Sequence, residues 1–129
     1  MTTARQDVSV GDCVSNLSAI ADELVTLSQS LQVIEKDHLY ELERAYEQGL
    51  MDFEAGMFER YEKGEGKWPG EETRERLFRR QMPTDALNEL MRYQAARKRA
   101  EKRIASLKAA ADSWRSILSA LKVELEASR

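Results

Sequence analysis

The chain has few of the residues that interrupt helices or carry chemistry. Among its 129 residues are two prolines, six glycines, one histidine and one cysteine. A single cysteine excludes a disulfide within the chain. We expect Cys13 to be a small buried side chain, because it lies in the apolar register between Val10 and Leu17; the alternative is a reactive thiol.

Long apolar segments are also missing. The chain has no run of about 18 apolar residues, the length needed to span a bilayer. Residues 1–10 contain one arginine and lack the apolar core of a secretory signal. Together these absences predict a cytoplasmic location without a membrane-spanning helix.

What the chain does contain matches long helices in composition, with 42% hydrophobic and 33% charged residues. Apolar residues recur at steps of three and four, the period of a coiled-coil seam. The first stripe comprises Leu17, Ile20, Leu24, Leu27, Leu31 and Ile34. The second comprises Leu90, Tyr93, Arg97, Ala100, Ile104, Leu107, Ala111, Trp114, Leu118, Leu121 and Leu125.

The two stripes lie in halves of opposite charge. Residues 1–65 carry 5 Lys/Arg against 14 Asp/Glu, whereas residues 66–129 carry 15 against 9. Antiparallel pairing of the halves places unlike charges side by side. We therefore predict an all-α fold, a long antiparallel helical hairpin that resembles a coiled coil, in which Leu24 lies near Leu118 and His38 near Ile104.

We expect one helical domain over residues 1–129. A loose N-terminus at 1–11 precedes a long helix at 13–63, which Asp12 is expected to cap. Glycines and Pro69 predict a turn and a short helix within 64–84, the helix covering about 71–81. The second long helix is expected at 85–127.

The first long helix is expected to change character after Ile34. Its stripe takes two four-residue steps there, to His38 and Leu42, and such a stutter locally unwinds a coiled coil. Glycine inside a helix costs about 1 kcal/mol relative to alanine. Gly49 and Gly56 therefore indicate close approach of a backbone or a bulky ring.

Further apolar side chains lie beyond a two-helix seam, and leaving them exposed would create a sticky surface. A homodimer that forms a four-helix bundle is the economical way to cover them. The residues concerned are Val14, Ala21, Val25, Leu87, Met91, Ile117 and Val123.

Catalysis has little support, and we expect neither enzymatic activity nor a cofactor. The one histidine, His38, lies in mid-helix, away from Cys13 and Ser113 in the predicted register. Glu35 and His38 form a Glu-x-x-His motif, which di-iron bundles use. We favour a structural histidine at the stutter, hydrogen-bonded to a carboxylate or to water, and a metal site in a dimeric bundle is the alternative.

Nucleic-acid binding is a stronger alternative. Arg74, Arg76, Arg79 and Arg80 form a basic cluster on the short helix, and basic helical stripes follow phosphates. A second cluster between Arg92 and Lys108 would be neutralised by the acids of the first long helix. The pI near 5.3 opposes general affinity for DNA.

Protein recognition is the preferred function. Trp68 lies in a glycine-rich turn, and exposed aromatic residues often anchor interfaces; the alternative is a ring packed against Gly49 or Gly56. The expected interface comprises Trp68, Phe53, Met57, Phe58, Leu77 and Phe78.

The segment from Trp114 to Leu125 resembles the tail of small α-helical hairpin proteins encoded by phages and prophages. In those, an aromatic-x-Ser step leads into Leu-Ser-x-Leu-Lys and an acidic end. The resemblance implies a phage accessory protein, associated with recombination or replication, and transfers no functional residues. Sequence alone thus favours a non-enzymatic scaffold that binds itself and another protein.

Overall fold

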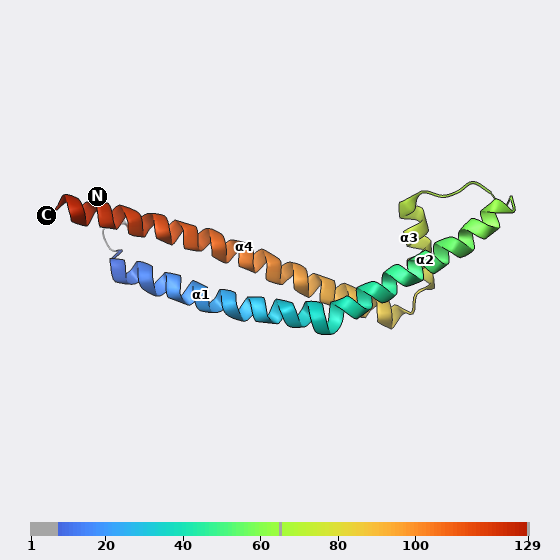
Figure 1. The fold of residues 1–129 in the computed structure, drawn as a ribbon, viewed down its shortest axis with the longest axis horizontal. Coiled ribbons are helices and arrows are strands. Elements are labelled where there is room, and N and C mark those ends of the chain that lie inside the picture. The colour runs from blue at the N-terminus through green and yellow to red at the C-terminus, as the bar shows by residue number, and fades with distance from the viewer. Residues whose placement is uncertain (1–7, 65, 129) are drawn as a thin grey trace. The chain divides into compact units, whose positions relative to one another are not determined.

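The structure is a computed structural model that describes residues 8–64 and 66–128. Its elements in chain order are α1 (Val10–Val33), the π-helix η2 (Ile34–Leu39), α2 (Tyr40–Glu62), α3 (Glu71–Gln81) and α4 (Thr84–Ala127) (Figure 1). Every element of the described residues is helical, which confirms the all-α expectation. None of these helices is apolar over a length that would cross a bilayer.

Helix α1 begins earlier than expected, at Val10, because Ser9 and Asp12 form a capping box. The Asp12 backbone N–H donates to Ser9 Oγ at 3.1 Å, and the Ser9 N–H donates to Asp12 Oδ2 at 2.9 Å. Asp12 is therefore the third helical residue, and the expectation that it is the N-cap is wrong. Of the predicted loose segment, Val10 and Gly11 are helical, residues 8 and 9 precede the helix, and residues 1–7 lie outside the described residues.

A π-helix occupies the site of the predicted stutter. Residues Ile34–Leu39 follow α1 directly and lead directly into α2. A π-turn accommodates one residue more than an α-turn, which is a form of local unwinding. The insertion brings Leu39, which the sequence analysis did not single out, to 1% exposure.

The seam predicted from periodicity matches the pattern of burial. All six residues of the first stripe are half-buried, and most of their neighbours on α1 are exposed. On α4, Leu90, Leu107 and Ala111 are buried and the other seam positions are half-buried, except Leu125, which is exposed. Cys13 is fully buried, as expected.

The chain divides into two compact units. One comprises Met1–Leu31 with Lys98–Arg129, and the other comprises Gln32–Arg97. In the first unit, α1 and the C-terminal part of α4 lie side by side (Figure 1). The guanidinium of Arg103 donates to both carboxylate oxygens of Glu23, at 2.9 and 3.1 Å.

This ion pair contradicts the predicted register. Leu24 was expected near Leu118, yet its neighbour Glu23 binds Arg103, about four turns earlier along α4. His38 was expected near Ile104, yet its ring stacks on Tyr93 within the second unit. A leucine stripe buries similar apolar area when the partner helix is shifted by whole turns. Apolar packing alone therefore does not fix the register, and the ion pair and the ring stack distinguish one register from the next.

The second unit contains η2, α2, α3 and the first turns of α4. Helix α2 ends at Glu62, and Gly64 follows with a φ of 90°, donating its N–H to the Tyr61 carbonyl. A positive φ at this place favours glycine and stops the helix. The observed α3, Glu71–Gln81, coincides with the short helix expected at 71–81.

Candidate protein-binding surface

The site is built from the contact of α3 with α2. Phe78 of α3 lies against the backbone of α2 at Gly49, where a Cβ would come within 2.9 Å of its Cζ atom. The ring also meets Tyr46 edge-on, with centroids 5.3 Å apart, and Phe53 at 5.7 Å. Gly49 thus provides the close approach to a bulky ring that the sequence indicated. Gly56 does not, since a Cβ there would meet nothing within 4 Å.

A polar network beside Phe78 holds the same two helices together. The Tyr46 hydroxyl donates to Glu75 Oε1 at 2.7 Å and accepts from Arg79 Nε at 3.0 Å. Arg79 Nη2 also donates to Glu75 Oε1 at 3.2 Å. Each member of the network therefore contacts both others.

The network shifts the protonation equilibria of its members. The hydrogen bond from Tyr46 lowers the pKa of Glu75 below its ordinary value of 4.5. Partial burial raises the pKa of Tyr46 above 10.0, and the carboxylate of Glu75 adds to this rise. Both shifts favour a neutral Tyr46 hydroxyl that donates to a charged Glu75 carboxylate.

The loop between α2 and α3 is organised around Trp68. Its indole meets the rings of Phe58 and Tyr61 edge-on, with centroids 5.7 and 5.6 Å apart. The guanidinium of Arg74 lies 5.1 Å from the centre of the same indole and donates to the Pro69 carbonyl at 2.8 Å. Trp68 therefore packs on α2 near its C-terminus, and the alternative that it covers Gly49 or Gly56 is wrong.

Arg74 also joins this loop to α2 through a charge. Its Nε lies 3.6 Å from Glu54 Oε2, too far for a hydrogen bond, and this nitrogen is buried without a hydrogen-bond partner. The Arg74 side chain is thus held by a cation–π contact, one hydrogen bond and one ion pair. Its function in the described structure is to fix the loop.

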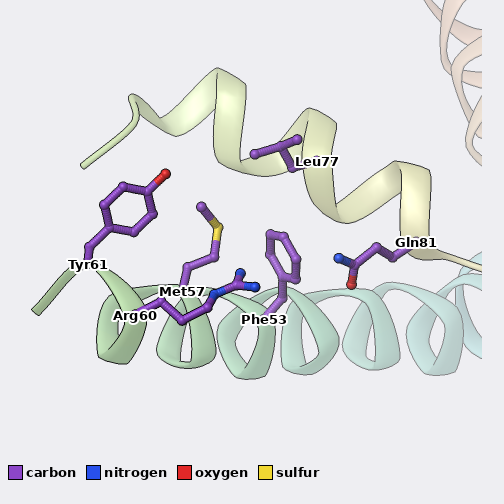
Figure 2. A pocket seen from close by; sticks show the side chains of 6 residues that line it. All are labelled: Phe53, Met57, Arg60, Tyr61, Leu77 and Gln81. Atoms are coloured by element: carbon purple, nitrogen blue, oxygen red, sulfur yellow. The ribbon is translucent and has the colours of Figure 1, made fainter. Parts of the chain in front are cut away.

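An open pocket of about 300 Å³ lies between α2 and α3. Figure 2 shows its side chains, which project from both helices towards the intervening space. Its apolar part contains the buried Met57 together with the half-buried Phe53 and Leu77. Arg60, Tyr61 and Gln81 supply the polar groups.

The six expected interface residues all lie in the second unit, but they differ in how far they are buried. Met57, with 2% exposure, is part of the local core, and Phe53, Leu77 and Phe78 are half-buried in the α2–α3 contact. Phe58 and Trp68 remain 57% and 40% exposed. Of the six, these two side chains are the ones that present a large apolar area to solvent.

The four arginines of α3 do not form one free cluster. Arg74 and Arg79 have the intramolecular partners given above, whereas Arg76 and Arg80 are exposed and form no ion pair with a described residue. On α4, Arg92 lies over the Tyr93 ring, and Arg97 donates to Glu43 Oε1 at 2.7 Å. Several basic groups are thus engaged within the chain.

The metal candidates Glu35 and His38 both lie on η2. The His38 ring stacks on Tyr93 with centroids 4.2 Å apart and planes within 8° of parallel. The stack places the imidazole against an aromatic ring, and the hydrogen bond expected for a structural histidine stays a prediction. The described residues contain no group of three or more His, Cys, Asp and Glu side chains placed to hold a metal ion.

Sequence reasoning missed the Tyr46–Glu75–Arg79 network and the Glu54–Arg74 pair. Glu75 and Arg79 are four residues apart on α3, a spacing that does signal an ion pair. Their link to Tyr46 joins residues about 30 positions apart, for which the sequence has no local signal. No protein-family model, curated protein or solved structure matches this chain.

Proposed function

We propose that this protein is a non-enzymatic scaffold that self-associates and binds another protein. The proposed assembly is a dimer of antiparallel hairpins that together form a four-helix bundle. The observation that carries the proposal is the excess of exposed over buried large apolar side chains. Those at least 40% exposed are Val14, Val25, Val33, Tyr40, Met51, Phe58, Trp68, Met91, Val123 and Leu125.

The buried set is small by comparison. Of the described residues, the buried apolar ones are Cys13, Leu39, Met57, Leu90, Leu107 and Ala111. Complete burial of one large apolar side chain contributes about 1.5–3 kcal/mol, so covering a half-exposed one contributes about 1 kcal/mol. Association itself costs about 4–15 kcal/mol. Self-association is therefore favourable only where several such side chains are covered together.

Two exposed regions suit two different contacts. Val14 and Val25 lie on α1 outside the seam, and they are suited to pairing with another long helix. Phe58 and Trp68 lie together at the end of α2, where Arg74 and Tyr61 hold the indole in place. An aromatic pair held by its neighbours loses little conformational freedom on binding. We propose this pair as the contact for a different protein.

The test is light scattering after size exclusion over a range of protein and salt concentrations. We expect a dimer that persists at high salt, because apolar contacts are not weakened by screening. Val25→Asp should shift the protein towards monomer. Ser30→Asp, an exposed change on another side of α1, should leave the dimer intact. A wild-type protein that remains monomeric at every concentration would contradict the proposal.

A nucleic-acid accessory function is the second candidate, and the exposure of Arg76 and Arg80 favours it. The resemblance of residues 114–125 to phage-encoded proteins agrees with either function. Fluorescence anisotropy with a short DNA duplex should give binding that weakens steeply with salt if these arginines contact phosphates. Charge reversal at both positions should then abolish binding, and no binding at low salt excludes this candidate.

A further inference from the structure

The pocket between α2 and α3 combines apolar walls with a cation that has no ion-pair partner among the described residues. Its lining contains Met57, Phe53 and Leu77 but no carboxylate. Arg60 forms no ion pair with a described residue, and Gln81, which also lines the pocket, supplies further donors through its amide. The pocket is thus suited to an apolar side chain that is followed closely by a carboxylate.

The C-terminal end of α4 has this chemistry. Val123 is 64% exposed, and Glu126, three residues later, is exposed on the same side of the helix. Ala127, four residues after Val123, shares that side and is exposed as well. The last turn of α4 contains no basic residue, so its negative dipole end is not compensated within the helix.

We propose that the pocket between α2 and α3 receives the end of α4 from a second copy of this chain, with Val123 against Met57 and Leu77, and Glu126 paired with Arg60. This inference rests on the proposed self-association and assigns residues to one of its contacts. In a two-fold dimer this contact forms twice, since the pocket of each copy receives the helix end of the other.

Size and charge both support this occupant. A volume of about 300 Å³ is at the lower end for ligand pockets, and it accommodates Val123 together with the small Ala127. Glu126 and the helix end bring negative charge towards the guanidinium of Arg60. A bidentate pair between arginine and a carboxylate is directional as well as attractive, so it would fix how α4 enters the pocket.

The test measures the dissociation constant for self-association by sedimentation of the full chain over a concentration series. We expect Arg60→Glu to weaken association about tenfold, since it replaces an attraction with a repulsion. Glu126→Arg should have a similar effect, and an equimolar mixture of the two variants should regain association to within about twofold of wild type. Recovery in the mixture requires that the two groups meet between molecules.

Matched controls separate this contact from net charge. Arg80→Glu changes the charge as Arg60→Glu does but lies outside the pocket, and Glu124→Arg lies about 100° around α4 from Val123. Both should change the dissociation constant less than about twofold. Far-UV circular dichroism should show unchanged helicity for all four variants, since all four side chains are exposed.

Each outcome has a definite meaning. Loss of association in both pocket and helix-end variants, with recovery in the mixture, supports the inference. If wild type associates and Arg60→Glu or Glu126→Arg leaves the constant unchanged, the inference fails and the proposed self-association stands. If Arg60→Glu weakens association and Glu126→Arg does not, another segment occupies the pocket. This result also overturns the inference. A monomeric wild type overturns the proposed function itself.

Discussion

Two glycines of α2 give a direct test of how α3 packs. Gly49 and Gly56 lie in the same helix, but a Cβ at Gly49 would come within 2.9 Å of Phe78 Cζ, while a Cβ at Gly56 would meet nothing within 4 Å. Replacing each with alanine therefore makes the same chemical change in two different surroundings. The difference between the two variants isolates the contact with Phe78.

The magnitudes follow from helix propensity and overpacking. Alanine is favoured over glycine in a helix interior by about 1 kcal/mol, so Gly56→Ala should stabilise the fold by about that amount. Gly49→Ala gains the same propensity but forces Phe78 to move, which costs about 1–3 kcal/mol. The tip of the ring is confined by Tyr46 and Phe53, which limits the movement available to it. We expect the free energy of unfolding of Gly49→Ala to be about 1–3 kcal/mol lower than that of Gly56→Ala.

Urea unfolding followed by far-UV circular dichroism measures this difference. Adding Phe78→Leu to each alanine variant completes the comparison, since the smaller side chain should relieve the clash at Gly49 and have no such effect at Gly56. If Gly49→Ala stabilises the protein as much as Gly56→Ala, Phe78 does not pack on the α2 backbone, and the reasoning about the α2–α3 contact is refuted.

Three further predictions concern the N-terminal cap of α1 and the hydrogen bond between Tyr46 and Glu75. Ser9→Ala should destabilise α1 by about 1 kcal/mol, because the Asp12 N–H loses its acceptor; the urea midpoint tests this, and an unchanged midpoint would argue against the capping box. Tyr46→Phe should cost about 1 kcal/mol, because Glu75 loses a hydrogen bond, and faster amide exchange in α3 should accompany the loss. The lowered pKa of Glu75 means that its contribution is complete above pH 4.5 and is lost as the pH falls through the folded-state pKa. In Tyr46→Phe the acid transition attributable to Glu75 should therefore shrink, and an identical acid profile in both proteins would contradict this assignment.

Periodicity and helix breakers predicted most of the helical elements. The steps of three and four residues placed Leu17 to Ile34 on one stripe, and the structure half-buries each of them. Gly64 and Pro69 predicted the segment between α2 and α3. Such a prediction is possible because the end of a helix is determined by the residues at and next to it. The Ser9-x-x-Asp12 pattern was also present in the sequence, but only Asp12 was considered, as the capping residue.

The pairing of helices was less predictable. Charge signs favoured contact between the acidic and basic halves of the chain, but they did not place Glu23 beside Arg103. Every turn of a leucine stripe resembles the next, so registers that differ by whole turns bury similar area. The π-helix adds a residue that heptad counting cannot anticipate in detail, and it brought Leu39 rather than His38 into full burial.

Some residues of the candidate surface had been named from the sequence. Trp68 was singled out by its glycine-rich turn, and the structure leaves it partly exposed beside Phe58. Arg74, whose guanidinium lies over the indole, was instead assigned to a nucleic-acid cluster. An arginine on an exposed helix can pair with water, phosphate or a neighbouring ring, and only the tertiary contacts distinguish these environments.

The small set of buried side chains has a calorimetric consequence. Globular proteins unfold with a heat-capacity increase of about 12–15 cal/mol/K per residue, most of which comes from hydration of newly exposed apolar surface. With Val14, Val25 and Val123 already largely hydrated in the folded chain, unfolding of the monomer should give a smaller increase per residue. The remainder should appear as a negative heat-capacity change when copies associate. If the chain self-associates as proposed, the decrease in heat capacity that most proteins of this length undergo on folding is divided between folding and assembly.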